Sequence, residues 1–270
     1  MNWIESLLYG LVSGFAEFLP VSSAAHQILM SKLFGSEGGN YLQDLLVHLA
    51  GLVVLCYSCR SLLQEMNNRP VAVRSGRRTV RKPPDIRLVR TAVIPLLLGF
   101  LLYPKANSLI QSLILPTVFF VINGIILYIP CRMMSGNKDA RGMSAFDSVL
   151  IGISGALAVF PGISRVGSMI SVAVARGADR QHALNWTLLL SVPALIVLIG
   201  FDVFGMFSGG SIAAGVSILG YILSAIGAAI GGYFGIMLMR FLAVKAGFSG
   251  FAYYSWGAAL FSFILYLIVL

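Results

Sequence analysis

Long apolar stretches separated by short polar segments run through this chain of 270 residues. A helix that crosses a lipid bilayer takes about 20 mostly apolar residues. Six stretches reach that length or come near it: about 44–59, 91–103, 116–130, 186–206, 212–236 and 251–270. The second and third of these are short for a crossing. This pattern predicts a membrane protein built from helices.

Two further apolar stretches, 4–19 and 148–160, stop at Pro20 and Pro161 and continue as short helical patterns over 21–33 and 163–176. Both breaks share one spacing: Ser-Gly, five residues, Pro, two residues and Ser, beginning at Ser13 and at Ser154. Apolar helices broken by Pro and Gly at matching points in two halves of a chain point to a buried binding site. We therefore expect two re-entrant helical hairpins, 4–33 and 148–176.

The basic residues predict the orientation of the chain, because cytoplasmic loops carry an excess of Lys and Arg. The segment 60–90 holds nine of them. With this basic loop in the cytoplasm, all of the 19 Lys and Arg except Lys32, Lys105 and Arg165 fall on the cytoplasmic face or at its border. One hairpin then enters from outside and the other from inside, which is an inverted-topology repeat.

The fold expected from these patterns is an all-α integral membrane protein with six transmembrane helices and two re-entrant hairpins. It forms a single polytopic membrane domain over 1–270, with repeat 1 at about 1–130 and repeat 2 at about 142–270. The composition agrees, since 58% hydrophobic and 11% charged residues with a mean hydropathy of +0.88 exclude an ordinary soluble domain.

The net charge of +9 is explained by the basic residues that set the orientation of the chain and by contact of the basic loop with anionic membrane lipids. No nucleic-acid partner is predicted, because no aromatic residues alternate with the basic ones. Three cysteines are too few for a disulfide framework. The pair Cys56 and Cys59 is interpreted as a packing face of a helix rather than as a metal site.

The residues with candidate chemistry lie at the two breaks. Ionisable side chains inside a bilayer are costly and are functional candidates by default. If the hairpin tips meet, a carboxylate, an imidazole, a guanidinium and three hydroxyls converge: Glu17, His26, Arg165, Ser22, Ser23 and Ser164. Half-helix N-termini and an arginine fork both favour phosphate oxygens. The pattern predicts a lipid with a phosphate or diphosphate head, its tail lying among the helices.

The same residues are also compatible with purely structural roles. Glu17 and Arg165 could form only a bridge between the hairpins, and the serines could only cap half-helices. His48 lies one turn after Asp44 and is interpreted as a hydrogen-bonded helix histidine. Asp202 is interpreted as a residue at the outer end of its helix.

The segment 17–26, Glu-Phe-Leu-Pro-Val-Ser-Ser-Ala-Ala-His, resembles the bacterial undecaprenyl-diphosphate phosphatase family, also called the bacitracin-resistance proteins. The Pro-Gly-Ile-Ser-Arg of 161–165 is similar to the family's second signature. The resemblance runs nearly end to end and includes 44–49, 188–193 and 251–254.

This resemblance implies a hydrolase of the bacterial cytoplasmic membrane that converts undecaprenyl diphosphate to the monophosphate and so recycles the carrier lipid for cell-wall synthesis. Carried over by position, Glu17 acts as a base or binds a divalent cation, Mg²⁺ or Ca²⁺. Ser23 is the nucleophile or a phosphate ligand, and His26 is its acid–base partner. Arg165, with Ser22 and Ser164, binds the diphosphate.

The chain departs from the family pattern at four positions, where it has Ser13, Val166, Met169 and Ser255. Loss of a carboxylate weakens binding of a divalent cation, and loss of hydroxyls removes phosphate contacts. A polyprenyl-phosphate transporter that does not hydrolyse its lipid is therefore the alternative expectation. The sequence leaves the oligomeric state open, a homodimer included.

Overall fold

The computed structural model describes residues 1–35, 41–67, 86–103, 113–133, 136–138, 142–208, 215–245 and 248–269. Over these ranges the chain is helical and forms no β-strand. Four helices are long and apolar enough to cross a membrane: α3 (Tyr41–Ser58), α10 (Arg180–Phe207), α11 (Ile218–Lys245) and α12 (Ser249–Val269). The prediction of an all-helical membrane protein is confirmed at this level.

The remaining helices are shorter. They are α1 (Trp3–Phe18), α2 (Ser23–Leu33), α4 (Arg60–Asn67), α5 (Ile86–Gly99), the 3₁₀ turn η1 (Phe100–Leu102), α7 (Ile114–Cys131), α8 (Ala145–Ala156), the 3₁₀ turn η3 (Leu157–Val159) and α9 (Arg165–Ala175). Each segment predicted to be helical contains a helix, including the two arms of both hairpins.

Some predicted boundaries differ from the structure. Residues 60–67 of the predicted basic loop form α4 and 86–90 begin α5, while 68–85 lie outside the described residues. Helix α11 continues to Lys245, through most of the predicted loop 237–250. Arg240 therefore lies within this helix, and its guanidinium donates to the carbonyl oxygen of Ser58 at 2.5 Å.

The first arms of the two hairpins begin in the same way. At α1, the Asn2 side chain accepts from the backbone N–H of Glu5, and the Glu5 carboxylate accepts from that of Asn2. At α8, Ser144 and Asp147 form the same reciprocal capping box. Such a box satisfies two backbone donors that a helix start otherwise leaves unpaired. In both arms, a short polar sequence therefore determines the residue at which the helix begins.

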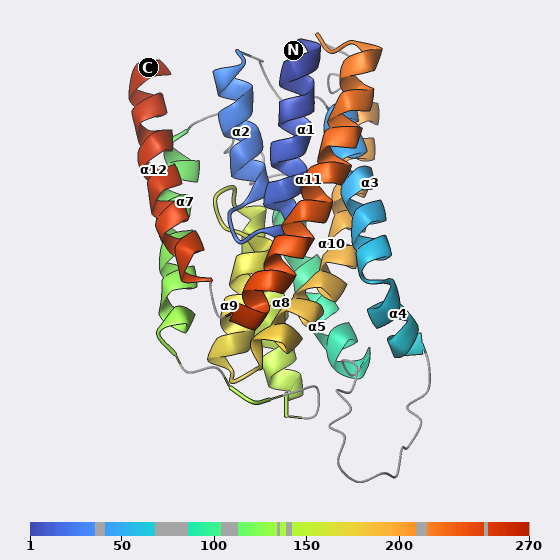
Figure 1. Cartoon of the computed structure of the whole chain (residues 1–270), viewed down its shortest axis with the longest axis vertical. Coiled ribbons are helices and arrows are strands. Elements are labelled where there is room, and N and C mark those ends of the chain that lie inside the picture. Colours follow the sequence, from blue (N-terminus) through green and yellow to red (C-terminus); the bar gives the residue numbers. More distant parts are fainter. Residues whose placement is uncertain are drawn as a thin grey trace.

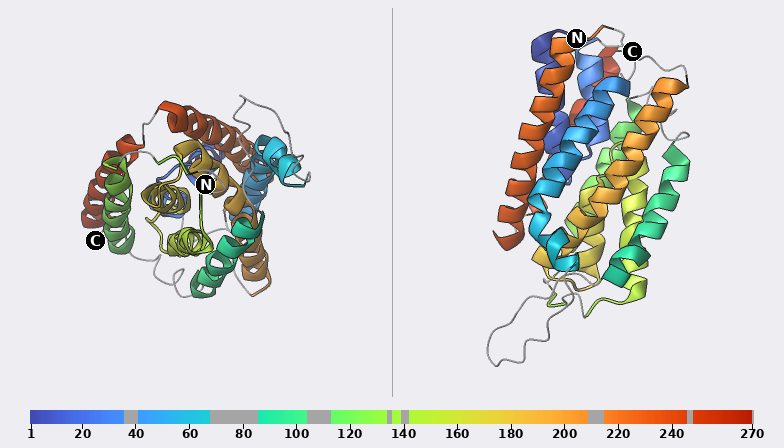
Figure 2. Two further views of the ribbon diagram at one scale, coloured as in Figure 1. Left: turned by 90° about the horizontal axis from the view of Figure 1, so that it is seen from below. Right: turned by 90° about the vertical axis from the view of Figure 1, so that its right-hand side faces the viewer.

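Figure 1 shows the hairpins entering the bundle from opposite ends, with α1 and α2 in the upper half and α8 and α9 in the lower half. Seen along the bundle in Figure 2 (left), α8 and α9 lie in the middle, surrounded by α3, α5, α7, α10, α11 and α12. Both termini lie at the end of the bundle occupied by α1 and α2. The two breaks thus come to the centre of the bundle.

Helix α1 is held by an unusually close contact with α11. A Cβ atom on Gly10 would lie 2.0 Å from the carbonyl oxygen of Ser224, and one on Gly14 would lie 2.2 Å from that of Ala228. Small residues four apart allow two helices in a membrane to approach backbone to backbone. These two glycines therefore fix the position of the arm that carries Glu17.

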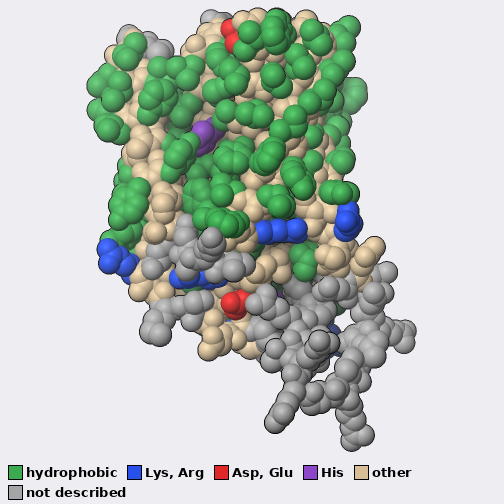
Figure 3. All heavy atoms as spheres, viewed as in Figure 1, with side chains coloured by type: hydrophobic (Ala, Val, Ile, Leu, Met, Phe, Trp, Pro, Cys, Tyr) green, Lys and Arg blue, Asp and Glu red, His purple; other side chains and the backbone are tan. Residues whose placement is uncertain are grey.

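The surface is predominantly apolar. In Figure 3, hydrophobic side chains cover the upper and middle parts of the visible face, whereas the visible Lys and Arg side chains gather in its lower part. An apolar belt above a basic rim is the distribution expected for a bilayer-embedded protein whose basic end faces the cytoplasm.

Candidate active site at the junction of the two hairpins

The two breaks contact each other directly. The Ser22 hydroxyl accepts a hydrogen bond from the backbone N–H of Gly162 at 2.9 Å, and the Ser164 hydroxyl donates to the carbonyl oxygen of Leu19 at 3.0 Å. Gly162 has φ 116° and Ser22 has φ 67°, the one positive value at a non-glycine among the described residues. A strained backbone of this kind persists only where surrounding contacts hold it. The hairpin junction is such a place.

Asn123, in the middle of α7, joins the two tips. Its amide nitrogen donates to the carbonyl oxygen of Pro20 at 3.1 Å, and its amide oxygen accepts from the backbone N–H of Ser164 at 2.9 Å. The amide also donates to the Ser255 hydroxyl at 2.9 Å. The sequence analysis missed this residue, although a lone amide inside an apolar helix is a signal that could have found it.

Arg165 and Glu17 form an ion pair across the junction. The distance from Nη2 of Arg165 to Oε1 of Glu17 is 2.5 Å, and the two side chains are 9% and 10% exposed. The Nε atom of Arg165 is buried and has no hydrogen-bond partner within the described part of the chain. A buried donor without a partner is costly, so this N–H is available to an anion.

A cavity of about 660 Å³ extends from this ion pair. Its walls come from α1, α2, α3, the turn after α5, the second break and α10. The polar and charged side chains that line it are Tyr9, Glu17, Ser22, Ser23, Gln27, Ser31, Lys32, Tyr41, Asp44, His48, Tyr103, Ser164, Arg165 and Asp202. A cavity of this size with a few convergent polar groups is typical of a ligand site.

Five of the six predicted site residues line this cavity: Glu17, Ser22, Ser23, Ser164 and Arg165. Ser23 is the first residue of α2, and its hydroxyl donates to the carbonyl oxygen of Ser13 at 3.1 Å. Gln27, one turn further along α2, adds an amide Nε2 that is buried without a partner in the described chain. Arg165 and Gln27, which both line the cavity, thus each hold one buried N–H donor without a partner in the described chain, near a hydroxyl at a helix N-terminus.

His26 is not among the residues that line the cavity. Its Nδ1 hydrogen-bonds the carbonyl oxygen of Ser22 at 2.8 Å, and its Nε2 hydrogen-bonds the Tyr254 hydroxyl on α12 at 2.6 Å. The helix period explains this, because the α2 residues that line the cavity centre on the face of Ala24, Gln27 and Ser31. At about 100° per residue, His26 lies on the other side of the helix. In the structure His26 holds the strained break at Ser22.

Two hydrogen-bonded pairs in the cavity differ from the sequence interpretation. His48 does not pair with Asp44: its Nδ1 lies 2.7 Å from Oδ2 of Asp202. Asp44 instead accepts from the Tyr9 hydroxyl at 2.5 Å. Asp202 is 3% exposed, so it is a buried residue of the cavity wall rather than one at the helix end. Residues 44 and 48 belong to two separate pairs.

The four departures from the family pattern lie outside the cavity lining. Ser13, Val166, Met169 and Ser255 are all fully buried. Met169 packs against Gly155, and Ser255 supports Asn123. These replacements therefore alter packing behind the site, and they leave the side chains that face the cavity in place.

The prediction of a divalent cation, with Glu17 as its ligand, stays a prediction. Such cations are held by several oxygen ligands, chiefly carboxylates. The described residues contain no group of three or more His, Cys, Asp or Glu that could hold a metal ion. Glu17 is also engaged by Arg165. This donor set does not fit a resident Mg²⁺ or Ca²⁺.

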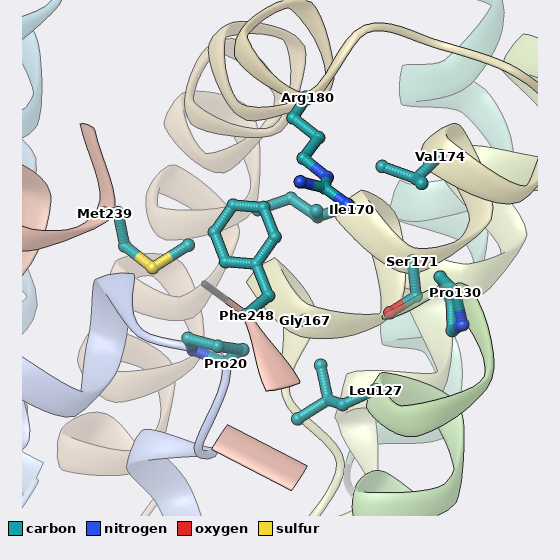
Figure 4. A pocket seen from close by; sticks show the side chains of 10 residues that line it. All are labelled: Pro20, Leu127, Pro130, Gly167, Ile170, Ser171, Val174, Arg180, Met239 and Phe248. Carbon is teal, nitrogen blue, oxygen red and sulfur yellow. The ribbon is translucent and has the colours of Figure 1, made fainter. Parts of the chain in front are cut away.

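A second, much smaller cavity of about 20 Å³ lies on the other side of the breaks. Figure 4 shows the residues that surround it, among them Pro20, Gly167 and Phe248, with the Arg180 guanidinium at its edge. This volume holds about one water molecule. A phosphate group therefore fits only the larger cavity, on the side of α2, α3 and α10.

Comparison with known proteins gives one family and a set of full-length relatives. Residues 6–261 match the family model described as "Bacitracin resistance protein BacA". The chain is 31% identical over 256 residues to a protein of Carboxydothermus hydrogenoformans named undecaprenyl-diphosphatase, covering 95% of this chain and 94% of the relative. Proteins of the same name from Methanobrevibacter smithii and Treponema denticola are 31% and 28% identical, each match covering at least 94% of both chains.

Proposed function

This chain belongs to the bacitracin resistance protein family, and from that membership and the hairpin junction we infer that it is an undecaprenyl-diphosphate phosphatase. The enzyme hydrolyses the terminal phosphate of the polyprenyl diphosphate and returns the monophosphate carrier lipid to cell-wall synthesis. Its substrate is a lipid, which agrees with an apolar helical protein.

The unpaired Nε of Arg165 is the observation that carries the assignment to this cavity. In the guanidinium, Nε and Nη2 lie on one edge, and Nη2 already binds Glu17. A phosphate oxygen at Nε would satisfy a donor that is otherwise buried without a partner. The Gln27 amide and the backbone N–H groups at the start of α2 supply further donors for the diphosphate.

We propose that Ser23 is the nucleophile and Glu17 its base. The Ser23 Oγ attacks the terminal phosphorus, and the hydroxyl proton passes to the carboxylate. The bond from that phosphorus to the bridging oxygen breaks, and the lipid monophosphate leaves. Water then cleaves the phosphoserine. Phosphoryl transfer depends chiefly on positioning and charge neutralisation, which Arg165 provides.

Three further residues keep this geometry. Ser22 and Ser164 tie the hairpins together through Gly162 and Leu19 while facing the cavity. Sequence resemblance gives His26 an acid–base role. Its contacts with Ser22 and Tyr254 support a positioning role instead, in which the imidazole holds the carbonyl of the strained residue.

We propose that the chain lies in the bacterial cytoplasmic membrane with six crossings and two re-entrant hairpins. Repeat 1 spans about 1–130 and repeat 2 about 142–270. The basic end visible in Figure 3 would face the cytoplasm, so that the cavity, which reaches Lys32 and Tyr41 near the ends of α2 and α3, opens toward the outside.

Phosphate release from undecaprenyl diphosphate by the purified chain in detergent tests the proposal. We expect steady release by the wild type, and at least about 10²-fold less by Ser23→Ala. The alternative, a lipid transporter without hydrolysis, predicts no release and lipid translocation in proteoliposomes that Ser23→Ala leaves intact. A wild type that translocates the lipid but releases no phosphate would contradict the phosphatase assignment.

A further inference from the structure

The cavity contains a second acid–base arrangement that the reaction above does not use. His48 on α3 and Asp202 on α10 form a hydrogen-bonded pair, Nδ1 to Oδ2 at 2.7 Å, and both residues line the cavity. They are buried, at 7% and 3% exposure. They stand 154 positions apart in the chain, so only the fold brings them together.

The geometry determines which ring nitrogen faces a ligand. A carboxylate at Nδ1 fixes the proton there, because a carboxylate accepts and the ring must donate. In the neutral ring Nε2 then keeps its lone pair. Within the described residues no hydrogen bond to Nε2 of His48 is formed, in contrast to His26, whose two ring nitrogens are both engaged. His48 is thus a base directed by a carboxylate, the arrangement that activates hydroxyls and water in many hydrolases.

The neighbours of His48 suit a group that takes up a proton. The carboxylates of Asp202, Glu17 and Asp44 line the same cavity as His48. Negative charge around an imidazole stabilises the imidazolium that forms when it accepts a proton. A pair that served packing alone would lie between apolar side chains, and buried ion pairs contribute little to stability on balance. This pair lies in the wall of the cavity of about 660 Å³ instead.

We propose that His48 is the general base of the second half-reaction and that Asp202 positions it. The inference rests on the proposed phosphatase function and deepens it. Water attacks the phosphorus of phosphoserine 23 and gives a proton to Nε2 of His48. The bond between that phosphorus and Oγ of Ser23 breaks, and Oγ takes back the proton held by Glu17. Inorganic phosphate leaves, and the imidazolium returns its proton to solvent.

Separate measurement of the two products tests this assignment. In rapid-mixing assays with undecaprenyl diphosphate, His48→Gln should release lipid monophosphate in a burst of about one equivalent per enzyme, at the wild-type rate. Its release of inorganic phosphate should then fall at least about 10²-fold, with phosphoserine trapped at position 23. Ser23→Ala should give no burst. Asp202→Asn should keep the burst and slow phosphate release to a smaller extent, and Asp202→Glu should restore part of the rate.

His182→Gln is the matched control, because His182 is a buried histidine that packs against Trp186 and does not line the cavity. We expect wild-type rates from it. Imidazole added to His48→Ala should restore phosphate release, an effect that a folding defect cannot produce.

The possible outcomes separate the two proposals. An active wild type whose His48→Gln variant releases phosphate at the normal rate overturns the inference alone. A variant that slows the burst and the steady phase equally also overturns it, since the residue would then be structural. A wild type that releases no phosphate overturns the phosphatase function, and the inference with it.

Discussion

Replacing Arg165 by lysine separates the charge of this residue from its shape. The guanidinium donates from Nη2 to Glu17 at 2.5 Å and presents a second, unpaired donor at Nε on the same edge. Lysine keeps the positive charge opposite Glu17, so the carboxylate is not left buried and unpaired. Its single ammonium cannot offer two parallel donors to a carboxylate and a phosphate.

The expected loss follows from the one charged hydrogen bond removed. A hydrogen bond to a charged group contributes about 1.5 to 3 kcal/mol. Since about 1.4 kcal/mol corresponds to a factor of ten in rate, Arg165→Lys should lower kcat/KM for undecaprenyl diphosphate by about one to two powers of ten. Arg165→Ala removes the charge as well and should lower kcat/KM further.

The chain supplies a matched control in Arg176, the C-cap residue directly after helix α9. Its Nε binds the Asp147 carboxylate at 2.5 Å, and neither residue lines the cavity. Arg176→Lys should keep kcat/KM near the wild-type value, because a half-exposed ion pair contributes at most about 1 kcal/mol to stability. Steady-state phosphate release measures both variants. Equal losses from the two substitutions, or a fully active Arg165→Lys, would refute the assignment of Arg165 to the phosphate.

Three further substitutions test the junction. Asn123→Ala should destabilise the fold by about 1 to 3 kcal/mol, since it leaves the buried N–H of Ser164 unpaired; an unchanged thermal unfolding temperature in detergent would contradict this. Gly14→Leu should separate α1 from α11 and aggregate on size-exclusion chromatography, whereas Gly257→Leu, with open space at its Cβ, should elute as the wild type does. Tyr254→Phe should lower kcat about fivefold, the equivalent of about 1 kcal/mol, by loosening His26; an unaltered kcat would show that this contact does not matter.

The helices and the breaks were predictable from sequence because each depends on local properties. The length of an apolar run limits a membrane helix, and Pro20 and Pro161 end the runs that they follow. The contact between the tips was predictable as well, since matching breaks in two halves are a property of the whole pattern. Glu17 and Arg165 were predicted to meet, and they do.

The direction of individual side chains was harder to predict. His26 follows Ser23 closely in sequence, yet Tyr254 and the carbonyl of Ser22 hold its ring away from the cavity. A helical wheel through α2, at about 100° per residue, puts His26 opposite Ala24 and Ser31, but the packing of the helices determines which of these faces lines the cavity.

Spacing within one helix could not predict the hydrogen-bond partner of His48. The sequence offers Asp44 at the favourable spacing of one helix turn, but Tyr9 on α1 binds Asp44 and leaves His48 to Asp202 on α10. Such partners depend on how α1, α3 and α10 pack together, which no spacing within one helix determines.

A crystal structure with a non-hydrolysable bisphosphonate analogue of the polyprenyl diphosphate would locate the phosphate site. We expect the terminal phosphonate to bind between Nε of Arg165, the amide of Gln27 and the Ser23 hydroxyl, in the cavity on the α2, α3 and α10 side of the breaks. A phosphonate bound outside this cavity, with Arg165 still joined only to Glu17, would contradict this expectation.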